Sequence, residues 1–167
     1  MTFLADEAIV GATCHGTLTI DGISMNRPAW AVLNNWVFWQ PAGLRGEDNI
    51  IPGTPGVLPN RRRKTVTTHT LELLIIGTCD EDGDAVPRSE WTTQLARNSE
   101  WLDEFVFTPP VTLEGTRTAV LTLPDGSTRT GEIHVLDPVY GVTTPVAITV
   151  ALDISIPAGQ LGPITGP

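Results

Sequence analysis

The sequence predicts a mainly β domain, an antiparallel β-sandwich with one α-helix packed on its flank. The 167 residues include 16 glycines and 14 prolines, a frequency typical of short strands joined by turns. Hydrophobic residues make up 41% of the chain, which is enough for a packed core, and only one segment has helical periodicity. We therefore expect a single domain over residues 1–160, followed by an extended Gly/Pro-rich tail at residues 161–167.

The first half of the chain predicts strands separated by one long loop. Residues 16–22 alternate in polarity and end in an Asp-Gly turn, and residues 30–39 are β-prone and aromatic. Residues 40–60 contain 4 prolines and 4 glycines and are expected to form a loop. The longest strand is expected at residues 64–76, with a solvated threonine-rich start and an apolar end buried on both faces.

The second half predicts the helix, a hairpin and a final strand. Apolar residues recur at helical spacing within residues 89–105. They are Trp91, Leu95, Leu102 and Phe105. Residues 118–136 have the signature of a β-hairpin, in which the Asp125-Gly126 pair is expected to supply positive φ angles. Residues 146–156 alternate strictly and predict a strand with one face in the core.

Charge and cysteine content exclude several functional classes. A formal charge of −9 argues against a broad nucleic-acid-binding face, which needs positive charge to neutralise phosphates. The N-terminus lacks the pattern of a signal peptide, and no apolar run is long enough for a membrane span. Cys14 and Cys79 are therefore expected to be reduced thiols, and with His15 and His69 they match no zinc-ligand spacing.

No catalytic constellation is visible, so we expect neither an enzyme nor a cofactor. His15, His69 and His134 lie in or beside predicted strands, without a nucleophile motif or a phosphate-binding glycine loop. An isolated strand histidine more often packs or faces solvent than acts as a base.

The acidic segment Asp80–Asp84 resembles the start of a calcium-binding loop, with aspartates at every second position. However, Gly83 is misplaced, Glu90 comes one position early and Trp91 occupies the twelfth position. The sequence therefore favours a solvated acidic turn and no metal site.

Three tryptophans allow two interpretations. Trp30, Trp36 and Trp39 could form a platform that stacks on sugar rings, or could fill a core or an interface. Phe38 lies in the same run, and exposing the whole run would be costly, so the sequence favours the core or interface.

A basic run at residues 61–64 holds 4 of the 10 positive charges. Contact with nucleic acid is one interpretation. Four charges make a small phosphate footprint, however, so contact with an acidic copy of the same chain is favoured.

One motif resembles a known family. Residues 44–56, Leu-Arg-Gly-Glu-Asp-Asn-Ile-Ile-Pro-Gly-Thr-Pro-Gly, lead into the basic run and the long strand. This stretch, with the order of the elements over residues 14–160, resembles the N-terminal domain of distal tail proteins and related tail-tube proteins of long-tailed bacteriophages. The resemblance implies a β-sandwich with a flanking helix, a hexameric ring, and a channel for DNA or the tape-measure protein.

We therefore expect a structural subunit of a phage tail, assembled in the host cytoplasm and located in the virion. Its expected partners are copies of itself, the tape-measure protein and adjacent tube or baseplate rings, with DNA only in passage and no membrane. The expected subunit contacts are Arg45, Arg61, Arg62, Arg63 and Lys64 on one side and Asp80, Asp82 and Asp84 on the other. The alternative is a carbohydrate-binding β-sandwich module that uses the three tryptophans.

Overall fold

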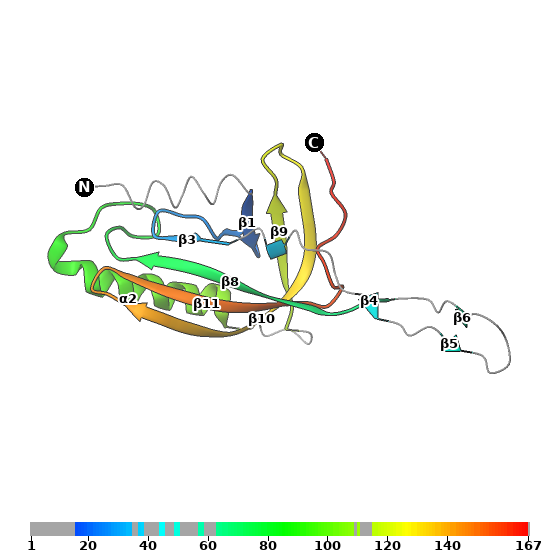
Figure 1. The fold of residues 1–167 in the computed structure, drawn as a ribbon. Coiled ribbons are helices and arrows are strands. Elements are labelled where there is room, and N and C mark those ends of the chain that lie inside the picture. Colours follow the sequence, from blue (N-terminus) through cyan, green and yellow to red (C-terminus); the bar gives the residue numbers. More distant parts are fainter. Residues whose placement is uncertain are drawn as a thin grey trace.

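A curled, seven-stranded antiparallel sheet forms the body of the protein (Figure 1). The computed structural model describes residues 16–34, 37–38, 44–45, 49–50, 57–58, 63–108, 110 and 115–166. In sheet order the strands are β2 (Ile23–Ser24), β1 (Thr17–Ile20), β9 (Arg117–Thr122), β10 (Thr128–Thr143), β11 (Ala147–Ile156), β8 (Thr67–Ile76) and β3 (Trp30–Val32). The concave face of the sheet packs against the hydrophobic core. The convex face is the other side of the sheet and points away from the core.

Two β-bulges bend the long strand β10. Leu136 and Asp137 together oppose the single residue Asp153 of β11. Further along, Gly141 and the next residue oppose Thr149, and a Cβ on Gly141 would lie 2.3 Å from the Thr149 Oγ1 atom. Bulges increase the local twist and bend a strand. Both bulges lie in the half of β10 that pairs with β11, beyond residues 128–133, which pair with β9.

The structure confirms a mainly β fold with one α-helix. The two facing sheets of the predicted sandwich are not confirmed, because the long strands of the described region join into one curled sheet, a half-barrel. The physical reason is β10, which hydrogen-bonds to both halves and therefore keeps them in one sheet.

Two tight turns have the residues their geometry needs. Asp21 and Gly22 join β1 to β2 with φ angles of 50° and 79°, as a two-residue type I′ turn requires. In the β9–β10 turn only Gly126 has a positive φ, so the expectation for Asp125 is wrong. The Asp125 carboxylate instead accepts hydrogen bonds from the Ser127 hydroxyl and backbone N–H, which lower the pKa of Asp125.

The helical segment packs on the concave face of the sheet. It consists of a 3₁₀ turn η2 (Arg88–Glu90), the helix α2 (Trp91–Leu102) and a π-helical turn η3 (Asp103–Phe107). Leu95 and Leu102 are buried as predicted, but Phe105 is 44% exposed. The widened last turn places Val106 and Phe107 in the core instead, and the regular helical period did not predict this change.

Backbone proximity and a side-chain amide attach the helix to β8. A Cβ on Gly77 would lie 2.1 Å from the Trp91 carbonyl oxygen, so only glycine permits this approach. The Asn98 amide donates to the carbonyl oxygens of Ile76 at 2.7 Å and Cys79 at 2.9 Å. The buried Gln94 donates in turn to the Asn98 side-chain oxygen.

The two longest predicted strands are present with small differences. β11 alternates as expected, with Val150, Leu152, Ile154 and Ile156 buried. β8 starts at Thr67, and at its apolar end Leu73 and Ile75 are buried whereas Leu74 and Ile76 are half-buried, so burial on both faces is correct only in part. Glu72 on the convex face is exposed, whereas Leu71 and Leu73 on the concave face are fully buried.

The C-terminal tail lies along β10. Thr165 and Thr128 exchange backbone hydrogen bonds of 2.9 Å, and the Gly162 N–H donates to the Thr130 carbonyl oxygen. Leu161 is fully buried and belongs to the hydrophobic core. The tail is thus extended, and it covers the edge of β10 that β11 leaves free.

Truncation of a helix residue tests this packing. Leu102→Ala should reduce the free energy of unfolding by about 2–5 kcal/mol, because it removes a fully buried side chain and leaves a cavity. Glu100→Ala, on the exposed face of the same helix, should change it by less than about 0.5 kcal/mol. Urea unfolding followed by circular dichroism measures both, and equal effects would place the helix outside the core.

Candidate functional site

An arm extends the sheet beyond the N-terminal end of β8 (Figure 1). We define the arm as strands β4 (Leu44–Arg45), β5 (Asn49–Ile50), β6 (Val57–Leu58) and β7 (Arg63–Lys64). β4 pairs with β7 and β5 pairs with β6, both antiparallel. The predicted loop at residues 40–60 therefore contains short strands that the many glycines and prolines concealed.

The arm continues the ladder between β3 and β8. The β3–β8, β4–β7 and β5–β6 ladders use the same two stretches of chain in succession, because β7 runs almost directly into β8. The motif at residues 44–56, on which the family resemblance depends, includes strands β4 and β5 of the arm.

The structure places three of the expected basic contact residues, Arg45, Arg63 and Lys64, on this arm. The register sets Arg45 directly opposite Arg63, and Leu44 opposite Lys64. Arg61 and Arg62 lie outside the described residues.

The expected acidic contact residues form a turn at the other end of β8. The Asp80 Oδ1 atom accepts hydrogen bonds from the backbone N–H groups of Asp82 at 3.1 Å and Asp84 at 2.8 Å. Asp80 therefore maintains the turn, whereas Asp82 and Asp84 are exposed. Within the described ranges, no group of three or more His, Cys, Asp or Glu side chains could hold a metal ion.

The tryptophans do not form one platform. Trp30 is only 1% exposed and stacks on Trp101, with ring centroids 5.1 Å apart. The Arg27 guanidinium lies 5.6 Å from the centroid of the Trp30 ring and 5.5 Å from that of the Trp101 ring. Trp36 and Trp39 lie outside the described residues. A sugar-binding platform that includes Trp30 is therefore excluded, because its ring is in the core.

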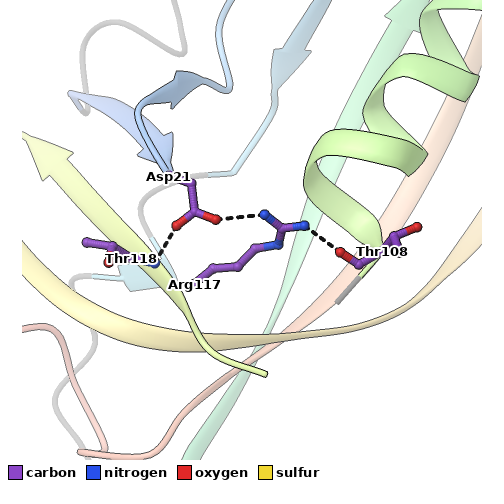
Figure 2. A network of polar contacts seen from close by, with 4 residues as sticks. All are labelled: Asp21, Thr108, Arg117 and Thr118. Carbon is purple, nitrogen blue, oxygen red and sulfur yellow. Dashed lines mark hydrogen bonds and ion pairs between the residues drawn. The ribbon is translucent and has the colours of Figure 1, made fainter. Parts of the chain in front are cut away.

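A buried arginine connects three segments at the other half of the sheet. Figure 2 shows the Arg117 guanidinium between the Asp21 carboxylate, at 2.7 Å, and the Thr108 carbonyl oxygen. The second Asp21 carboxylate oxygen accepts a hydrogen bond from the Thr118 N–H. This polar clamp joins the β1–β2 turn, the start of β9 and the end of η3. The sequence did not predict this clamp. The only local indication of it was Asp21, which lies in a type I′ turn.

The two described histidines, His69 and His134, have different surroundings. His69 is buried against Phe38 and packs opposite Ile154, whereas His134 is half-buried and opposes Ser155. Burial lowers the pKa of His69, and its Nε2 atom has no hydrogen-bond partner in the described part of the chain. Burial also raises the pKa of the free Cys79 thiol, which disfavours the reactive thiolate. Cys14 and His15 lie outside the described residues.

Comparisons with known proteins add no family. No protein-family model matches the chain, and no curated protein is significantly similar to it. No helix in the described region is long and apolar enough to cross a membrane.

A double-mutant cycle tests the polar clamp. Asp21→Asn keeps a residue that tolerates positive φ but removes the charge, and Arg117→Gln removes the guanidinium. We expect a coupling energy of about 1–3 kcal/mol in the free energy of unfolding, since the hydrogen bonds are charge-assisted and Arg117 is buried. Additive effects of the two substitutions in urea unfolding would contradict a direct pair.

His69 should make stability depend on pH. Its pKa is lowered in the folded protein from an ordinary value of about 6.5, so the unfolded chain binds the proton more readily. The resulting stability is fully present above about pH 6.5 and is lost as the pH falls towards the lowered pKa. Urea unfolding at several pH values between 5 and 7.5, roughly the range of histidine titration, should show a flatter dependence for His69→Gln.

The matched control for this experiment is His134→Gln, which removes a half-buried histidine of β10. It should keep the pH dependence of the wild type. An unchanged dependence in His69→Gln would show that the buried imidazole does not resist protonation.

Proposed function

We propose that this protein is a structural subunit of a long-tailed bacteriophage tail. It is a tail-tube or distal-tail protein that assembles with copies of itself into a ring, by its resemblance a hexamer, around the channel for DNA. Adjacent tube or baseplate rings and the tape-measure protein are its other proposed partners. Its proposed location is the tail of the virion.

The observation that carries the proposal is the arm. It extends from the end of β8, away from helix α2, where a neighbouring subunit can contact it (Figure 1). Residues 44–64 hold Arg45, Arg61, Arg62, Arg63 and Lys64, which are half of the 10 positive charges in a chain of net charge −9. The family resemblance rests on the same segment, which supports the proposal that this segment is the subunit contact.

Charge separation favours contact between different patches of two copies. The basic arm and the acidic turn at residues 80–84 lie at opposite ends of β8, a strand of 10 residues that is about 33 Å long at 3.3 Å per residue. One subunit cannot pair them internally. A head-to-tail contact joins unlike patches and closes into a ring when the rotation allows, and complementary charges set its register and accelerate encounter.

Charge reversal on the arm tests the proposal. Arg63→Glu/Lys64→Glu, in strand β7, should leave the monomer folded and should prevent assembly, because it replaces attraction to an acidic neighbour by repulsion. Circular dichroism verifies folding. Sedimentation velocity and negative-stain microscopy at physiological salt measure assembly, and the wild type should form rings or tubes.

The matched control is Arg88→Glu/Arg97→Glu, which changes the net charge equally at two exposed residues of the helical segment. It should assemble like the wild type. A wild-type protein that stays a monomer at all concentrations would overturn the proposed function, and normal assembly of the arm variant would exclude the arm as the contact.

A further inference from the structure

Strands β8, β11 and β10 present an acidic and apolar surface on the convex face of the sheet. We define the convex patch as Glu72, Leu136, Asp137, Val139 and Asp153. The register sets Glu72, Ala151 and Val139 in one row across the three strands. Asp153 lies in the next row, where its carboxylate accepts a hydrogen bond from the Thr70 hydroxyl and faces the bulge of Leu136 and Asp137.

Two large apolar side chains of the convex patch are exposed to solvent. Val139 is 67% exposed and Leu136 is 44% exposed, although both are large apolar side chains. Exposed apolar groups with a polar rim are typical of binding surfaces. The bulge that bends β10 is also what turns Leu136 and Asp137 outwards together, opposite one residue of β11.

The charged side chains of the convex patch are all negative. Glu72, Asp137 and Asp153 are exposed carboxylates. In the three strands, which are described throughout, the only Lys or Arg is Arg129, and its guanidinium donates to the Gly162 carbonyl oxygen at the far end of β10. A partner for this surface therefore needs positive charge together with apolar side chains.

We infer that the convex patch of one subunit binds the arm of a second copy of the chain. The segment of residues 44–64, which contains the arm, has half of the positive charges, and the arm strands also contain Ile50, Val57 and Leu58, so the composition of the segment complements the patch in both respects. A subunit's own arm lies beyond the N-terminal end of β8, whereas the patch lies on strands β8, β11 and β10 (Figure 1). The inference rests on the proposed assembly function and specifies its acceptor surface.

The acidic turn is the competing acceptor, and it fits less well. One carboxylate oxygen of Asp80 is occupied by the backbone of the turn itself. Asp82 and Asp84 remain exposed, but they flank Gly83 and no large apolar residue. The turn thus offers charge without apolar surface, whereas the convex patch offers both.

Peptide binding tests the inference directly. A fluorescently labelled peptide of residues 44–64 is titrated with the full-length protein, and fluorescence anisotropy gives the Kd. Glu72→Lys/Asp137→Lys should weaken binding about tenfold or more, corresponding to about 1.4 kcal/mol. Val139→Ser should also weaken it without changing the charge, which separates docking from general electrostatic attraction.

Two variants with the same change in net charge are the controls. Asp82→Lys/Asp84→Lys alters the acidic turn, and Glu100→Lys/Glu104→Lys alters exposed residues of the helical segment. Both should keep the Kd within about twofold, which is the effect of a distant surface charge under screening. Circular dichroism and thermal unfolding of every variant verify that the body stays folded.

The outcomes separate the inference from the proposed function. Weaker binding in the turn variant alone, equal weakening in all three charge variants, or no binding of the wild type would each overturn the convex patch as acceptor. If the wild type still forms rings in such a case, the proposed function stands and another surface accepts the arm. If the patch binds the peptide but the wild type forms no rings, the acceptor is correct and the tail function is wrong.

Discussion

The bend of strand β10 is the constraint on which the rest of the structure depends. Residues 128–133 pair with β9, and the rest of the strand, which contains both bulges, pairs with β11, so a single bent strand holds the two halves in one curled sheet with a concave face. That face is apolar and has to be covered, and helix α2 covers it with Leu95 and Leu102. Gly77 allows the helix backbone to approach β8 closely enough for this packing.

Polar contacts attach the flanking segments to this frame. Asn98 ties the helix to the loop after β8, and Arg117 ties η3 to the β1–β2 turn. Such bonds add modest net stability, but leaving a buried partner without them is costly. They therefore determine where the helix and the first hairpin sit, while the apolar core supplies most of the driving force.

The bend of β10 also places the hydrophobic core and the convex patch proposed for assembly on opposite faces of the sheet. The concave face takes the apolar side chains of β8, β10 and β11, which leaves acidic residues and Val139 on the convex face. Half of the positive charges lie in residues 44–64. This division suits the proposed subunit. Its concave face forms the core that stabilises the fold, and its convex face and arm are the surfaces proposed to contact other copies.

The sequence by itself determined the local elements, because their signals depend on neighbouring residues. Strict alternation identified β11, helical periodicity identified α2, and Asp-Gly pairs located the turns at Asp21 and Asp125. The tertiary structure alone decided the single curled sheet, the π-helical turn that exposes Phe105, and the burial of Trp30. Each of these depends on contacts between segments distant in the chain, such as Trp30 with Trp101 and Asp21 with Arg117. The candidate site divides in the same way: composition located the basic segment, but only strand register and the bulge brought Glu72, Asp153 and Val139 onto one face.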